Sequence, residues 1–353
     1  MMSLAMLFAY MSTFLACGLP EALGELYPSC ADDVGGQQSG LAAKPSYIYL
    51  REELGRWAEV LDEAPDRDVV TDLEAVRRIE ATGLPWRIVD KRSGAIFLLV
   101  PPGEFLRGAP REDDYTVHEF EFPWRRQVRV AKPFYLGQTE LTCEQWASVM
   151  GVTPGYIEEA ELDPEKTPLV DVSVEEFLPF LALTGLSLPR ASDWEYACRA
   201  SNGQKQVEAL HDFARVQGNV DVWDKRLTPI VSVATRKANA WGFFDMLGGA
   251  YELTSTVFDL AWEGPPKGEL YDSVRDDELG ESPYTERFGT RFTVRGGSLG
   301  APEECATPWH VGTQTPTKGH ITIGYRVAWY PEECRPSFAL LSKRVGEAVN
   351  RAK

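Results

Sequence analysis

Histidine side chains exchange protons and bind metals near neutral pH, and the chain has four, His118, His211, His310 and His320. No two of them lie at the helical spacing of a metal-binding pair, and the HExxH motif of zinc proteases does not occur. A phosphate-cradling P-loop is absent as well. The 53 Asp and Glu residues are abundant, but their spacing identifies no acid–base pair. The spacing of the histidines therefore gives no sign of a zinc-protease site.

The best-defined element that could position a site is the stretch 187–200, SLPRASDWEYACRA. Ser192 and Glu195 have the S-x-x-E spacing of a capping box, which predicts a helix that starts there. Trp194 and Cys198 then fall on one helical face at i and i+4. A large indole above a thiol is typical of a helix packed into a core, so we expect a structural helix.

Other local patterns predict a mixture of helices and strands. Three further capping boxes predict helix starts at Thr71–Glu74, Thr142–Gln145 and Ser173–Glu176. The spacing of Leu54, Trp57 and Leu61 predicts an earlier helix over residues 51–64, and a basic amphipathic helix is expected at 336–353. Runs of apolar and β-branched residues predict strands at 86–90, 95–100, 103–108, 127–136 and 321–329, the first two forming a hairpin.

Composition excludes some partners. The chain has 353 residues and a formal net charge of -17, which argues against a phosphate-binding surface and therefore against nucleic acid. A hydrophobic content of 44% is normal for a soluble globular protein. The 10 Trp, 24 Pro and 30 Gly residues favour an irregular, loop-rich fold over a helical bundle.

The N-terminal segment is typical of an exported protein. Residues 4–17 are almost wholly apolar and too short to span a membrane, which fits the core of a signal peptide. Phe14-Leu15-Ala16-Cys17 resembles a bacterial lipoprotein cleavage box, although no Lys or Arg precedes the apolar core. We therefore expect a periplasmic or outer-envelope lipoprotein, anchored to a membrane only through a lipidated Cys17. The alternative is an apolar leader without this role.

These patterns divide the chain into five parts. We predict a leader at 1–17, a linker at 18–47, a helical extension at 48–85, a main domain at 86–332 and a helical tail at 333–353.

Five blocks in the main domain, at 98–108, 134–149, 168–200, 239–254 and 295–328, occur in an order that resembles the formylglycine-generating enzyme family. This family is also called the sulfatase-modifying factor family. The resemblance covers roughly residues 86–330 and includes the GGS and IGYRVA segments near the end. It implies an irregular α+β fold with a C-type-lectin-like core and little regular secondary structure.

The resemblance also shows which chemistry is missing. Two cysteines on the loop after GGS bind copper in the family's oxidases, since soft monovalent copper favours thiolates. The corresponding loop here, 299–305, contains Cys305 alone. The family pattern implies instead that Cys305 forms a disulfide with Cys198, with two buried thiols as the alternative. We therefore expect no copper and no formylglycine generation.

The resemblance further implies calcium sites built from hard oxygen ligands. The ligands of the first would be Asp245, Gly248, Ala250 and Glu252, and those of a second would be Asn219 and the carbonyl of Val220. The alternative for both is acidic loop caps without a metal.

Four residues fall near the family's pocket and are ligand-pocket candidates: Ser298, Trp309, His310 and Arg326. The alternative for His310 is an ordinary surface or hydrogen-bonded histidine. Since the cysteine pair is absent, we expect an exported, noncatalytic member that binds a ligand, peptide or protein. The alternatives are an enzyme with non-copper chemistry, such as oxidative tailoring of a peptide or siderophore, and a purely structural partner of another envelope protein.

Overall fold

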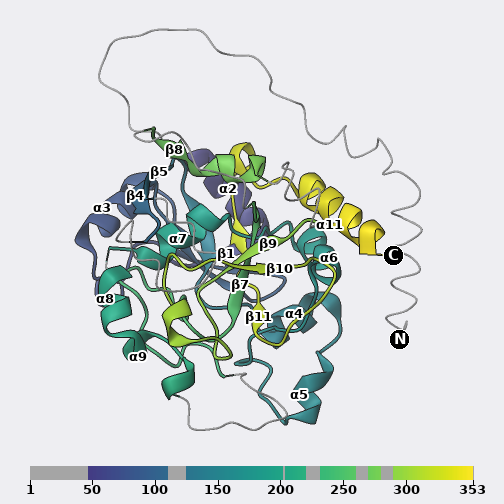
Figure 1. The fold of residues 1–353 in the computed structure, drawn as a ribbon. Coiled ribbons are helices and arrows are strands. Elements are labelled where there is room, and N and C mark those ends of the chain that lie inside the picture. Colours follow the sequence, from purple (N-terminus) through teal and green to yellow (C-terminus); the bar gives the residue numbers. More distant parts are fainter. Residues whose placement is uncertain are drawn as a thin grey trace, which may run out of the picture. The chain divides into compact units, whose positions relative to one another are not determined.

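The computed structural model describes residues 47–109, 125–201, 203–219, 231–259, 269–279 and 289–352 (Figure 1). The chain forms two units, 1–44 and 45–353, and all described residues belong to the second. The predicted leader, including Cys17, therefore lies outside the described residues. Within the described ranges, no helix combines the length and apolar character needed to cross a membrane.

The largest sheet has five antiparallel strands in the order β1-β2-β3-β6-β12. They are β1 (Ala58–Asp62), β2 (Arg87–Asp90), β3 (Ile96–Val100), β6 (Phe134–Gly137) and β12 (Ala328–Trp329). The predicted hairpin of β2 and β3 is confirmed. The predicted helix over 51–64 is wrong in its second half, because α2 (Ile48–Trp57) ends where β1 pairs with β2. Val60 and Leu61 of β1 are half exposed, so Leu61 belongs to no buried helical face.

Two smaller sheets complete the β-structure. One contains β10 (Gly312–Gln314), β9 (Phe292–Arg295), β7 (Tyr251–Val257) and β11 (Ile323–Gly324), and the other contains β4 (Gly103–Arg107), β5 (Arg126–Val130) and β8 (Tyr271–Asp272). The single strands predicted at 127–136 and 321–329 are wrong. Each of these segments forms two strands that join different sheets, so the chain leaves one sheet for another in the middle of the apolar run.

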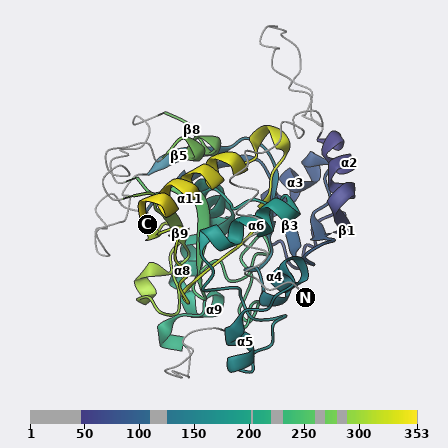
Figure 2. The same ribbon diagram turned by 90° about the vertical axis from the view of Figure 1, so that its right-hand side faces the viewer.

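The helices cover these sheets. They are α3 (Leu73–Thr82), α4 (Cys143–Met150), α5 (Gly155–Glu159), α6 (Val174–Thr184), α7 (Ala191–Arg199), α8 (Gly203–Glu208), α9 (Leu210–Phe213) and α11 (Phe338–Ala352). Short 3-10 turns are η2 (Gln217–Asn219), η3 (Ser273–Glu278), η4 (Glu303–Cys305) and η5 (Glu332–Cys334). The terminal helix α11 packs alongside α6 (Figure 2). Helix α11 agrees with the helix predicted from residue 336 onward.

Two of the predicted capping boxes are confirmed and two are wrong. Those at Thr142 and Ser173 form as predicted and begin α4 and α6. The cap of α3 is Asp72 and not Thr71, because the Asp72 carboxylate accepts the backbone N–H groups of the first turn. Helix α7 begins after Arg190 without any side-chain cap, since Ser192 and Glu195 are bound elsewhere.

Candidate functional site

The turn before β7 brings several segments into contact. Gly248 has a φ of 75°, and a Cβ there would lie 2.2 Å from the carbonyl oxygen of Arg215. Gly249 has a φ of 63°, and its Cβ would lie 2.9 Å from Glu140 Oε1. Only glycine combines this backbone conformation with such close approaches. The sequence Gly-Gly therefore lets β7 begin directly beside both neighbours.

Strand β7 has two faces that do different things, because successive side chains of a strand point to opposite sides. Glu252, which is fully buried, faces Arg326 and Trp194. Its carboxylate accepts hydrogen bonds from Arg326 Nε at 2.8 Å, Arg326 Nη2 at 2.6 Å and Trp194 Nε1 at 2.6 Å. Arg326 donates to two backbone carbonyl oxygens as well. On this face, a buried ion pair with three hydrogen bonds to the Glu252 carboxylate joins β7, α7 and the segment before β12.

The contacts of Glu252 do not fit its predicted role as a calcium ligand, because the buried guanidinium of Arg326 already neutralises its carboxylate. Across the described ranges, no group of three or more His, Cys, Asp or Glu side chains is placed to hold a metal. Calcium binding stays a prediction for this position. It would depend on Asp245 and on the carbonyl oxygens of Gly248 and Ala250.

The second predicted calcium site has less support from the geometry. The amide of Asn219 caps its own turn, since its Nδ2 donates to the carbonyl of Ala214 at 2.8 Å and its Oδ1 accepts from Val216 N at 3.1 Å. Val220 lies outside the described residues. The side chain of Asn219 is therefore committed to the backbone.

Two further carboxyl groups are buried near Glu252, at Glu140 and Asp245. Glu140 Oε1 accepts a hydrogen bond from Ala250 N at 2.9 Å, and Asp245 accepts one from Ala234 N. Burial raises the pKa of Glu140 well above its ordinary value, and the carboxylates of Asp245 and Glu252 raise it further. Burial also raises the pKa of Asp245. The sequence analysis missed Glu140, because nothing nearby in sequence marks a partner 110 residues away.

The other face of β7 contains a thiol, a phenol and an imidazole. The hydroxyl of Tyr251 lies 3.2 Å from His310 Nε2 and shares a hydrogen bond with the thiol of Cys305. Cys305 is 3% exposed and His310 is 5% exposed. Burial raises the pKa of Tyr251 well above its ordinary value, and the adjacent Cys305 raises it further. The phenol therefore stays protonated and links two polar groups inside the protein.

The four pocket candidates do not form one cluster. His310 bonds to Tyr251, whereas Arg326 lies on the opposite face of β7 with Glu252. The indole of Trp309 packs against the guanidinium of Arg199, 5.4 Å from the ring centre. Ser298 is buried, and its hydroxyl has no hydrogen-bond partner among the described residues.

Residues 296–300 read Gly-Gly-Ser-Leu-Gly, which matches the G-x-S-x-G pattern of serine nucleophiles, a match that the sequence analysis missed. That pattern needs a strand before the serine, a helix after it and a base in contact with the hydroxyl. Strand β9 does end at Arg295, but the next helical element is only the three-residue turn η4. The hydroxyl of Ser298 bonds to no base within the described residues, so the geometry does not favour a serine hydrolase.

Cys198 and Cys305 are thiols in this structure and do not form the disulfide that the family resemblance implied. Cys198 is fully buried, with its sulfur 3.9 Å from the carbonyl oxygen of Met246, whereas Cys305 contacts Tyr251. Burial raises the pKa of the Cys198 thiol well above its ordinary value. The alternative of two buried thiols describes these sites.

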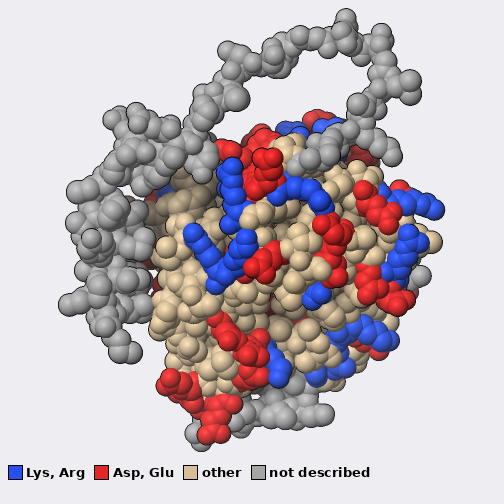
Figure 3. Space-filling view, turned by 180° about the vertical axis from the view of Figure 1, so that it is seen from behind, with Lys and Arg blue, Asp and Glu red and all other residues tan. Residues whose placement is uncertain are grey.

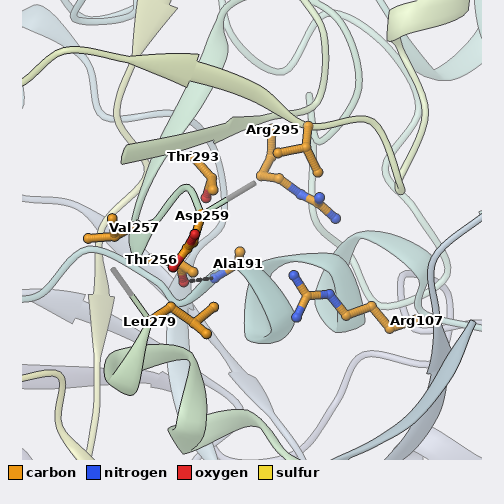
Figure 4. Close-up of a pocket in the computed structure, with 9 residues that line it drawn as sticks. Arg107, Ala191, Thr256, Val257, Asp259, Leu279, Thr293 and Arg295 are labelled. Atoms are coloured by element: carbon orange, nitrogen blue, oxygen red, sulfur yellow. Dashed lines mark hydrogen bonds between the residues drawn. The ribbon is translucent and has the colours of Figure 1, made fainter. Parts of the chain in front are cut away.

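A small cavity lies near the far end of β7 (Figure 4). It is lined by Arg107, Ala191, Thr256, Val257, Asp259, Leu279, Thr293, Arg295 and Val311. Its volume of about 10 Å³ has room for about one water molecule, and none of the pocket candidates lines it. We therefore assign it no substrate.

Beside this cavity, the charged groups of α7 stabilise the fold. Glu195 is fully buried and contacts three guanidinium groups, those of Arg295, Arg199 at 2.6 Å and Arg107 at 3.8 Å. It also accepts a hydrogen bond from Gly108 N at 2.9 Å. Burial acts to raise the pKa of Glu195, but Arg199, Arg295 and Arg107 hold it below its ordinary value. This network supports the prediction that α7 is structural.

Comparison with known proteins agrees with this fold. A model of the sulfatase-modifying factor enzyme 1-like domain matches residues 89–331, which is more than half of the chain. The chain therefore belongs to the sulfatase-modifying factor family, and the predicted α+β fold with a C-type-lectin-like core is confirmed. A search of curated protein sequences finds no match.

Solved structures share the fold at low sequence identity. PvdO from Pseudomonas aeruginosa aligns with a TM-score of 0.50 and 19% identity, over 69% of this chain and 98% of that protein. Treponema denticola variable protein 1 aligns with a TM-score of 0.51 and 16% identity, over 67% of this chain and 95% of that protein. At these identities the likeness concerns the fold alone.

Proposed function

We propose that this protein is a noncatalytic member of the sulfatase-modifying factor family that binds a ligand, a peptide or a protein partner through its lectin-like scaffold. The observation that carries the proposal is the sulfur content of the loop after Gly296-Gly297. Residues 298–311 contain one cysteine, and its thiol is buried against the hydroxyl of Tyr251. Copper(I) chemistry of the family type needs two converging thiolates, so a single buried thiol does not support it.

The scaffold itself supports a binding role. The ion pairs of Glu252 and Glu195 stabilise the core without using any residue of the Tyr251 face. That face can therefore vary in its side chains while the fold persists. On the face shown in Figure 3, described acidic and basic side chains are interspersed, which suits a protein or small-molecule partner better than a polyanion.

One contact favours a second candidate function. The hydrogen bond of 3.2 Å between Tyr251 and His310, beside the thiol of Cys305, places an imidazole and a phenol close to a sulfur atom. An enzyme that performs oxidative tailoring of a peptide or siderophore without copper would use such a group. The burial of both Cys305 and His310 makes this the weaker candidate.

The deciding experiment is an oxidation assay with a cysteine-containing peptide, copper(I) and dioxygen. Mass spectrometry of the peptide would report conversion of cysteine to formylglycine. We expect the same background for the wild-type protein and for the matched variant Cys305→Ser. Conversion by the wild type above the Cys305→Ser background would overturn the noncatalytic proposal.

We also propose that the protein is exported and anchored through Cys17. The apolar segment at 4–17 and the lipoprotein-like box before Cys17 support this proposal.

A further inference from the structure

Glu303, in the loop that follows Gly296-Gly297, forms hydrogen bonds with a segment far away in the sequence. Glu303 Oε1 accepts a hydrogen bond from Gly218 N at 2.9 Å. Both of its carboxylate oxygens lie 3.2 Å from His211 Nε2. These partners belong to α9 and η2, which are about 90 residues earlier in the sequence. The contact is therefore a tertiary link between the loop and the α9–η2 segment.

Glu303 and Cys305 are the two ends of the short turn η4. This turn packs directly on the Gly-Gly pair, because a Cβ on Gly297 would lie 2.8 Å from Ala306 Cα and 2.9 Å from the carbonyl oxygen of Cys305. The buried, unpartnered hydroxyl of Ser298 follows Gly297 directly in the chain. The turn therefore packs on Gly297, next to the position of Ser298.

The link that holds the turn is exposed, whereas the thiol that the turn carries is buried. The side chains of Glu303 and His211 are 37% and 54% exposed, so solvent screens their attraction. Cys305, two residues after Glu303, is 3% exposed. The turn is therefore held on its outer side by a solvent-screened contact, while the thiol that it carries is buried.

We propose that residues 299–305 form a lid and that the hydrogen bonds of Glu303 keep this lid closed. In the closed state described here, the carboxylate binds Gly218 N and His211, and η4 keeps its own Cys305 buried in contact with Tyr251. Release of the carboxylate lets residues 299–305 move away and exposes the Cys305 thiol together with the Ser298 hydroxyl. This inference rests on the proposed binding function, because the uncovered groups would contact the ligand.

A substitution at Gly218 would break the hydrogen bonds of Glu303. A Cβ at this position would lie 2.0 Å from Glu303 Oε1, so Gly218→Ala forces the carboxylate away without changing the charge of the protein. Gly55→Ala is the matched control, because a Cβ at Gly55 meets nothing within 4 Å. Glu303→Gln is a second variant that keeps the side-chain shape and removes its charge.

The experiment measures alkylation of each cysteine by iodoacetamide in the folded protein, with peptide mass spectrometry. We expect Cys305 to react about fivefold faster in Gly218→Ala than in the wild type, and the direction to be the same in Glu303→Gln. Cys143 and Cys198, both buried in the core, should keep their wild-type rates and report any general loosening. Gly55→Ala should leave all rates unchanged.

The outcomes separate the lid from simple destabilisation. An unchanged Cys305 rate in both variants would overturn the proposal. A rise shared by Cys305, Cys143 and Cys198 would overturn it as well, because it would report global unfolding. The alkylation rates do not depend on the peptide oxidation assay, so failure of the lid and failure of the noncatalytic proposal are distinguishable.

Discussion

Removal of the buried guanidinium of Arg326 is the most direct test of how this fold is stabilised. Arg326 and Glu252 are both fully buried, and their charged groups share two hydrogen bonds of 2.8 Å and 2.6 Å. The variant Arg326→Met keeps a long apolar side chain but leaves the carboxylate of Glu252 buried beside Glu140 and Asp245. Trp194 would remain its donor, and one indole N–H does not neutralise a charge.

The expected cost follows from the burial. Removing one partner of a buried ion pair costs about 3–5 kcal/mol, because the other charge stays in a medium of low polarity. The two backbone carbonyl oxygens that accept from Arg326 would lose a charged donor, which adds about 1–3 kcal/mol for each that stays dry. We therefore expect a loss of at least about 4 kcal/mol in the free energy of unfolding, or about 6 °C in Tm for a unit of this size.

Urea denaturation followed by tryptophan fluorescence would measure the change, with two companion variants. The single variant leaves the carboxylate of Glu252 buried without a partner. The double variant Arg326→Met/Glu252→Gln removes that charge as well, so it should recover part of the stability. Arg77→Met is the exposed control, since Arg77 and Glu74 pair at the surface with side chains 74% and 65% exposed. Its effect should stay within about 0.5 kcal/mol.

The reasoning fails if Arg326→Met loses less than about 1 kcal/mol. It also fails if the double variant is no more stable than the single variant, because an unpaired buried charge would then not be the cause.

Four other predictions concern Glu140, Asp245, Tyr251 and Cys17. Glu140→Gln should raise the free energy of unfolding at pH 8 relative to the wild type, and this difference should shrink toward pH 4. The folded-state pKa of Glu140 is raised, so the wild type loses stability as rising pH ionises the buried carboxyl group, whereas the glutamine variant does not. Equal pH profiles of the two proteins would contradict this. Calcium added after chelation should raise Tm in the wild type but not in Asp245→Asn, because the predicted site would hold the ion through the Asp245 carboxylate and the carbonyl oxygens of Gly248 and Ala250; no shift in the wild type would remove the calcium prediction. Tyr251→Phe should cost about 1 kcal/mol in urea denaturation, because one buried hydroxyl link is lost while the ion pair behind β7 remains; a loss as large as that of Arg326→Met would contradict the division into two faces. Metabolic labelling with a fatty acid should mark the wild type in bacteria but not Cys17→Ala, and equal labelling would refute anchoring at Cys17.

Local signals predicted those elements whose ends are determined by neighbouring residues. The boxes at Thr142 and Ser173 formed because the side chains of each box bond to the backbone of their own first turn. The box at Ser192 did not form, because Glu195 is drawn to Arg295, which is 100 residues away. A capping pattern is therefore reliable only where no distant partner competes for the same carboxylate.

The strand errors have a related origin. Residues 127–136 and 321–329 each read as one apolar run, but each run supplies strands to two sheets. Periodicity reports that a segment is buried and does not report against which sheet. The extension 58–62 was misread for the same reason, since its pairing with Arg87–Asp90 is a tertiary contact.

The site could be predicted only as far as residue types determine chemistry. The single cysteine in the loop was visible in the sequence, and it still carries the noncatalytic proposal. The pairing of Glu252 with Arg326 was not visible, because two adjacent residues of β7 have opposite surroundings and the sequence does not state which face meets which neighbour.

This division of β7 separates the groups that stabilise the core from the loop that follows Gly296-Gly297. The groups that stabilise the core lie behind the strand, at Glu252, Arg326 and Trp194. On the other face of the strand, the hydroxyl of Tyr251 contacts Cys305 and His310, and a single hydrogen bond of this kind contributes less than a buried ion pair. A substitution at Tyr251 should therefore cost less stability than a substitution that leaves the buried carboxylate of Glu252 without its guanidinium partner.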